Sequence, residues 1–118
     1  MKGAVKAAMP AQAIPMLATL EVKPPKGDGW LYEVKWDGVR ALCFLRDGER
    51  RMYTRAGNPC ERQYPELSIL PHEVDAREAI LDGEIAVLDP QGRSRFGLLQ
   101  PRSSVTDANS IAHLARSK

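Results

Sequence analysis

The sequence predicts an α+β fold in which an antiparallel β-sheet is accompanied by flanking helices. Several runs are rich in β-branched and aromatic residues, and two of them are separated by Asp47-Gly48, a pair typical of a tight hairpin turn. Stretches with apolar residues at helical spacing lie between and after these runs. The chain has 118 residues, of which 43% are hydrophobic and 27% charged, as in a small soluble domain or a piece of a larger one.

Strands are expected in four places. Residues 30–35 (WLYEVK) begin the regular structure, and residues 39–46 and 50–55 form the hairpin. Residues 79–88 (AILDGEIAVL) are the longest β-type run and end at a turn.

Three helices are expected around these strands. Residues 65–70 open a short helix, and residues 96–100 form a second one with Ser94 as its N-cap. Residues 108–116 form the last helix, with Asp107 as its cap and apolar residues along one face.

The N-terminal residues 1–29 are expected to form an irregular lead-in, because prolines and a Gly-Asp-Gly turn prevent a regular helix. The remaining residues, 30–118, are expected to form the domain. Apolar stretches in the lead-in are too short for a signal peptide or a membrane span. We therefore expect a cytoplasmic protein that does not contact a membrane.

Charge and cysteine content narrow the function classes. The net charge of 17 − 15 = +2 permits nucleic-acid binding but does not demand it. Two cysteines, Cys43 and Cys60, are too few for a disulfide framework, and with two distant histidines they do not make a zinc site.

Strand alternation gathers charged side chains. In an extended segment three charged residues share one face, namely Glu33, Lys35 and Asp37. Asp82 and Glu84 share a face of the later strand in the same way. A lysine and several carboxylates converge if the two strands are neighbours. The alternative interpretation is that these charges mark the solvated face of a half-buried sheet.

Three ordered motifs favour a specific interpretation. Lys35-Trp36-Asp37-Gly38 resembles the KxDG signature of covalent nucleotidyltransferases, a superfamily of ATP-dependent DNA ligases, RNA ligases and mRNA capping enzymes. Thr54-Arg55-Ala56-Gly57 resembles the family's second motif, and Leu81-Asp82-Gly83-Glu84 its third. The flanks, residues 15–18 and 96–100, are similar to the ligase domain of bacterial DNA ligase D.

The resemblance implies a self-adenylation chemistry. In this family a lysine attacks the α-phosphorus of ATP, expels pyrophosphate and keeps AMP through a phosphoramidate bond. The AMP then passes to a 5′-phosphate at a DNA nick, and the 3′-hydroxyl displaces it. The attacking lysine must be a neutral amine, whereas a free lysine is mostly protonated at neutral pH. ATP and Mg²⁺ are the implied cofactors, and nicked or broken double-stranded DNA is the implied partner.

By motif matching, Lys35 is the implied nucleophile. Glu33 falls where the family places a residue of the adenine pocket, and Asp37 is expected to orient or tune Lys35. Gly38 is expected to let the chain turn without a Cβ in the way. Trp36, together with Trp30, is expected to pack in the core or at its rim.

The implied phosphate and metal ligands lie on the later strands. Arg40 and Arg55 are expected to contact phosphate or the ribose region, because a guanidinium offers paired donors. Glu84 is expected to accept from the ribose hydroxyls or to help hold Mg²⁺, which prefers oxygen ligands.

The resemblance also implies a partial ATP-grasp-like nucleotidyltransferase domain. Later strands, further motifs and an OB-fold domain of the family are not found before Lys118. We therefore expect that a C-terminal ligase segment or OB-fold domain is missing, and that activity ranges from weak to none. The alternatives are an inactive remnant that binds nucleotide or DNA, an RNA ligase or capping-type enzyme, and a structural β-rich domain with a chance K-x-D-G.

Overall fold

The computed structural model describes residues 3–103 and 108–116, and its centre is a three-stranded antiparallel sheet. The strands are β1 (Val39–Arg46), β2 (Glu49–Thr54) and β3 (Glu78–Ile85), in the order β2-β1-β3. Asp47 and Gly48 connect β1 to β2 with φ angles of 49° and 83°. Two successive positive φ values match the right-handed twist of a hairpin, so this turn confirms the sequence prediction.

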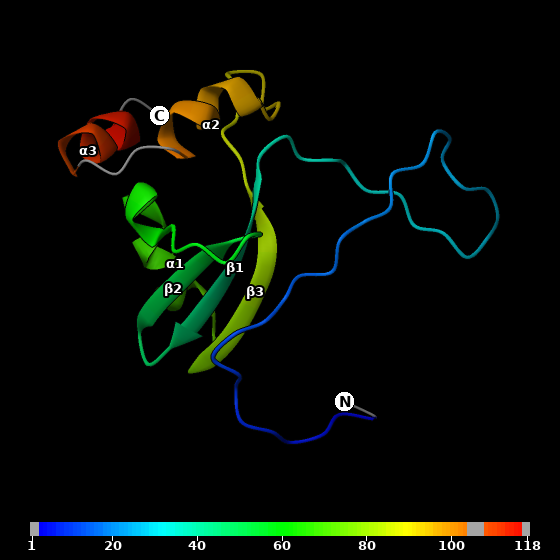
Figure 1. The fold of residues 1–118 in the computed structure, drawn as a ribbon, viewed down its shortest axis with the longest axis horizontal. Helices are drawn as coiled ribbons and strands as arrows, with labels where there is room; N and C mark the ends of the chain where they lie inside the picture. The colour runs from blue at the N-terminus through cyan, green and yellow to red at the C-terminus, as the bar shows by residue number, and fades with distance from the viewer. Residues whose placement is uncertain (1–2, 104–107, 117–118) are drawn as a thin grey trace.

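One face of the sheet carries the hydrophobic core. Ala41, Cys43 and Leu45 of β1 point to this face together with Met52 of β2. The face is covered by two 3₁₀ helices and three α-helices or their ends: η1 (Glu61–Gln63), η2 (Pro65–Ile69), α1 (Leu70–Glu73), α2 (Phe96–Ser103) and α3 (Ala108–Arg116). Figure 1 shows these helical segments gathered on one side of the sheet and the N-terminal segment on the other. Leu99 of α2 is completely buried in this core.

The opposite face is covered by the lead-in. Leu42 and Phe44 of β1 are buried there, and the Phe44 ring meets the Tyr53 ring edge-on at 5.7 Å between centroids. Residues 9–15 border two hollows of about 290 and 230 Å³ over this face. β1 therefore has five consecutive buried residues, as expected for a strand covered on both sides.

The expected strand at residues 30–35 is wrong. This segment has no regular structure, and its side chains are exposed, with Trp30 at 55% and the following Trp36 at 48%. A strand requires a hydrogen-bonding neighbour, and residues 30–35 pair with none of the three strands of the sheet. Trp30 and Trp36 consequently lie outside the core, against expectation.

The other expected elements are found with shifted ends. The run 79–88 pairs with β1 only as far as Ile85, followed by a single bridge between Leu88 and Ser94. The helix expected at 65–70 is a 3₁₀ helix continued by α1, and the helix at 96–100 extends to Ser103. The helix at 108–116 is confirmed, whereas its expected cap Asp107 lies outside the described residues.

Arg102 ties α2 to the core. Its side chain is 5% exposed, and Nη2 donates to both carboxylate oxygens of Glu66, at 2.7 and 2.8 Å, and to the Gln63 carbonyl. The guanidinium also lies over the Tyr64 ring, 5.3 Å from its centroid. This arrangement holds the last turn of α2, which continues past Pro101.

We expect Arg102→Ala to lower the free energy of unfolding by about 2 kcal/mol, because charge-assisted hydrogen bonds to Glu66 and Gln63 are lost. Urea unfolding measures the change. Arg62→Ala is the control, since Arg62 is exposed and makes no hydrogen bond with the described residues. Equal losses in the two variants would refute the role of Arg102.

Candidate functional site

The segment that enters β1 touches the end of β3 at Gly38. A Cβ built on Gly38 would lie 2.0 Å from the Ile85 carbonyl oxygen and 3.1 Å from Ala86 Cα. Only glycine tolerates such a close backbone approach. The sequence predicted that Gly38 leaves room for the chain, and the structure identifies the neighbour that needs the room.

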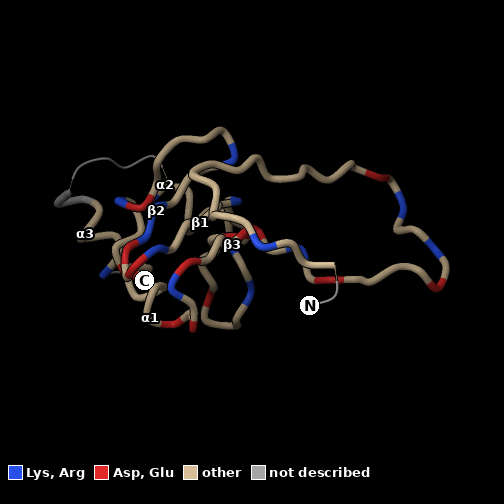
Figure 2. Tube along the Cα trace, turned by 90° about the horizontal axis from the view of Figure 1, so that it is seen from below, with Lys and Arg blue, Asp and Glu red and all other residues tan. Residues whose placement is uncertain are grey.

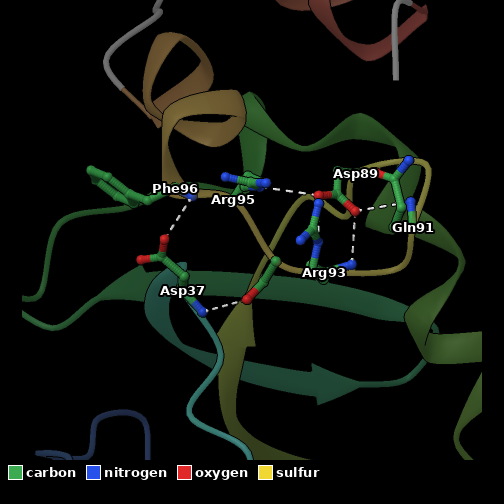
Figure 3. Close-up of polar contacts among 7 residues, drawn as sticks. Asp37, Asp89, Gln91, Arg93, Arg95 and Phe96 are labelled. Atoms are coloured by element: carbon green, nitrogen blue, oxygen red, sulfur yellow. Dashed lines mark hydrogen bonds and ion pairs between the residues drawn. The ribbon is translucent and has the colours of Figure 1, made fainter.

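Asp37 links the same segment to the start of α2. Its backbone N–H donates to Ser94 Oγ at 2.8 Å, and its carboxylate accepts from the Phe96 N–H at 3.1 Å (Figure 3). Phe96 is the first residue of α2, so Asp37 satisfies one of the free amides at that helix start. Ser94, the expected N-cap, lies two residues before α2, and its hydroxyl accepts from the Asp37 N–H, whereas the Asp37 carboxylate binds the first amide of the helix.

Arg40 forms a paired contact with Asp82 across β1 and β3. Nε lies 2.9 Å from Oδ1 and Nη2 lies 2.6 Å from Oδ2. The hydrogen bond from Arg40 holds the pKa of Asp82 below its ordinary value, and the same bond raises the pKa of Arg40. A further Arg40 donor, Nη1, reaches the Met16 carbonyl of the lead-in. As placed, Arg40 joins β3 and the lead-in to β1.

Glu84 lies on the same sheet face as Asp82, directly opposite Arg40 in the strand register. It is exposed and makes no hydrogen bond or ion pair with the described residues. Its charge adds to the effect of Asp82 in raising the pKa of Arg40. The expected pairing of Asp82 and Glu84 on one face is confirmed by this register.

The remaining candidates are exposed. Lys35 and Glu33 lie in the irregular segment before Gly38, and neither makes a hydrogen bond or ion pair within the described part of the chain. Arg55 follows β2 and lines the hollow of about 230 Å³ beneath residues 12–15. The structure thus gathers Arg40 and Glu84 on one sheet face, with Arg55 at its border.

The described residues supply only part of the ligand set that a Mg²⁺ ion requires. Across residues 3–103 and 108–116, no three His, Cys, Asp or Glu side chains gather as a metal site. Asp82 is occupied by Arg40, which leaves Glu84 as the free carboxylate on this face. Mg²⁺ is commonly held by one or two carboxylates with substrate phosphates and water, so Glu84 suits such a partial set.

Sequence analysis missed the network around Asp89. Its Oδ1 accepts the N–H groups of Gln91 and Arg93, at 3.0 and 2.9 Å, and its Oδ2 accepts from Nε of Arg93 and Arg95 (Figure 3). The backbone hydrogen bond from Arg93 is the main cause that lowers the pKa of Asp89. The sequence showed only a turn here, although an Asp followed by arginines four and six positions later was the available signal.

No helix in the described ranges is long and apolar enough to cross a membrane. The charged residues of β1 are all basic, namely Arg40 and Arg46, and those of β3 are all acidic, namely Glu78, Asp82 and Glu84. Elsewhere along the described chain both signs occur (Figure 2).

Comparison with known proteins decides the family. The profile of the ATP dependent DNA ligase domain matches residues 9–117, which include all three motifs. This chain belongs to that family. The expected enzyme family is therefore confirmed.

Several curated members of this family are similar in sequence to the chain. It is 38% identical over 99 residues to the multifunctional non-homologous end joining protein LigD of Pseudomonas aeruginosa, covering 84% of this chain and 12% of LigD. It is 44% identical over 84 residues to DNA ligase C1 of Mycolicibacterium smegmatis, covering 70% of this chain and 24% of that protein. The chain therefore spans a small part of the curated relatives it matches.

Solved ligase structures share the fold. The mycobacterial DNA ligase D complexed with ATP and MES superposes with a TM-score of 0.54 at 35% identity, over 61% of this chain and 24% of that one. The ligase domain of LigD from M. tuberculosis gives a TM-score of 0.53, also at 35% identity, over 64% and 25%. These matches confirm the expected α+β fold as part of a ligase adenylation domain.

We expect Gly38→Ala to destabilise the fold by about 1–3 kcal/mol, because the added methyl group meets the backbone of Ile85. Thermal or urea unfolding measures the effect. Gly83→Ala in β3 is the matched control, since nothing lies within 4 Å of its ideal Cβ. A Gly38 variant as stable as the Gly83 variant would contradict the close approach.

The Arg40–Asp82 pair predicts a small dependence of stability on pH. Because the folded-state pKa of Asp82 lies below the ordinary value of 3.8, the pair stabilises above that pH and the gain is lost as the pH falls below it. Asp82→Asn should cost less than about 1 kcal/mol at pH 7, since the pair is partly exposed. Urea unfolding at several pH values tests this, and a deficit that persists in strong acid would count against it.

Proposed function

We propose that this chain carries the nucleophile-bearing part of an ATP-dependent DNA ligase, with Lys35 receiving AMP from ATP. In this proposal the AMP passes to a 5′-phosphate at a DNA break, and the phosphodiester bond then forms during DNA repair. Family membership over residues 9–117 and the position of Lys35 within its KxDG motif support the assignment. The cytoplasm is the compartment we expect.

The observation that carries the proposal is the junction at Gly38. Gly38 packs on the backbone of Ile85, and the register sets Glu84 opposite Arg40 two residues further along β1. The segment that carries Lys35 therefore meets the sheet at the end of β3 that bears Glu84. Arg55 borders the same face, so a nucleotide held between these residues would meet donors for its phosphates.

The chain's own residues divide the work in this proposal. Lys35 provides the attacking amine, Glu33 lies at the adenine, and Asp37 fixes the segment through its bonds to Ser94 and Phe96. Arg55 binds phosphate oxygens. Bound Mg²⁺ would neutralise phosphate charge, with Glu84 as its protein ligand.

A second candidate is a module that binds nucleotide or DNA without chemistry. It is favoured by the exposure of Lys35, whose side chain makes no hydrogen bond or ion pair among the described residues. An amine that stays in water is mostly protonated and does not attack phosphorus.

Labelling with ATP that carries a label in its α-phosphate separates the two candidates. With Mg²⁺ we expect faint covalent labelling of the chain, and its complete loss in Lys35→Ala. Lys26→Ala is the control, because Lys26 is an exposed lysine of the lead-in. Label that survives in Lys35→Ala excludes Lys35 as the nucleophile, and absence of label with retained nucleotide or DNA binding favours the second candidate.

A further inference from the structure

The turn between β3 and α2 carries two arginines, Arg93 and Arg95, on a backbone that is fixed by hydrogen bonds. The Asp89 N–H donates to the Arg93 carbonyl at 2.8 Å, and the Gly92 N–H donates to the Asp89 carbonyl at 2.9 Å. The Arg95 N–H donates to the Val87 carbonyl at 2.9 Å. These bonds fix the backbone on both sides of Arg93 and Arg95 before their side chains are considered.

One carboxylate orients both guanidinium groups. Arg93 and Arg95 each use Nε, at 3.2 and 3.0 Å, to bind the same Oδ2 of Asp89 (Figure 3). The Asp89 side chain is 9% exposed, whereas those of Arg93 and Arg95 are 63% and 54% exposed. In the described structure the Nη groups of both arginines make no other hydrogen bond. The outer donors of both guanidinium groups therefore face solvent while the Asp89 carboxylate holds both groups. Two arginines and one aspartate give this cluster a net charge of +1.

We propose that the turn 89–95 binds backbone phosphates of the DNA on which this chain acts. Guanidinium forks match phosphate oxygens in pairs, and anchoring through Nε leaves the outer donors of both arginines free for that contact. Fixing the side chains in advance lowers the entropy cost of binding. The inference rests on the proposed function, because it requires a chain that hands AMP to DNA.

The position of the turn fits DNA better than ATP. Ser94, which lies between the two arginines, accepts a hydrogen bond from the N–H of Asp37, two residues after Lys35. A DNA strand whose 5′-phosphate receives AMP must approach Lys35, and this hydrogen bond ties the turn to the segment that carries Lys35. The arginines stand exposed on a turn, and the hollows beside the sheet are lined by other residues, whereas nucleotide sites are concave. Roughly half or more of protein–DNA hydrogen bonds go to phosphates and sugars, and exposed arginine side chains are among their donors.

The test measures binding of the full 118-residue chain to a fluorescent nicked duplex with a 5′-phosphate, over a series of KCl concentrations. We expect Arg93→Ala/Arg95→Ala to reduce the slope of log K against log[salt] by about 1.8, and each single variant by about 0.9. The matched control is Arg62→Ala/Arg116→Ala, which removes the same charge from two exposed arginines outside the turn. We expect its slope to equal that of the unchanged chain.

Equal reductions in both double variants, or no salt-dependent binding by the unchanged chain, would overturn the inference. α-Labelled ATP without DNA supplies the separate readout for the proposed function. Labelling at Lys35 with a slope that is insensitive to Arg93 and Arg95 refutes the inference alone. A reduced slope without labelling refutes the adenylation proposal alone. If the double variant loses label while DNA binding is unchanged, the arginines serve the phosphates of ATP, and the DNA inference is refuted.

Discussion

The packing of Gly38 against the backbone of Ile85 is the constraint on which the arrangement of the motifs depends. It sets where the Lys35 segment meets the sheet, and it brings the start of β1 to the end of β3. Asp37, the neighbouring residue, then binds the first amide of α2, so the junction holds the sheet, the helix and the motif together. A larger residue at position 38 would separate these three parts at once.

One face of the sheet packs on helices, as in any two-layer domain, and the other carries the charged side chains Arg40, Asp82 and Glu84. On the other face, Leu42 and Phe44 lie between charged side chains, and the lead-in covers them while Arg40 and Arg46 bind its carbonyls at Met16 and Met9. The lead-in is thus a third layer. The contact with the lead-in and the pair with Asp82 together occupy the guanidinium of Arg40, so fewer of its donors are free for a ligand than the motif suggested.

Much of the fold followed from sequence because its signals are local. The Asp47-Gly48 turn and the apolar run of β1 identify a hairpin without knowledge of anything distant. The segment 30–35 has equal β-propensity, yet propensity describes how a side chain fits a sheet and does not supply a neighbouring strand. The Asp37–Phe96 cap and the covering of Phe44 by the lead-in join residues far apart in sequence, and no periodic pattern encodes such pairs.

The sequence predicted which residues form the candidate site, but it did not predict which of them bind one another. The motifs named Arg40, Asp82 and Glu84, and alternation placed the two carboxylates on one face. The register sets Glu84 opposite Arg40, and only the side-chain contacts show that Arg40 pairs with Asp82 instead. In the proposed function, the reactivity of Lys35 would depend on its surroundings. Its segment exposes Trp30, Trp36 and other apolar side chains, and an amine between them is desolvated only when a further surface covers the segment. A surface that covered this segment would exclude water from the amine and bury these aromatic rings in the same step.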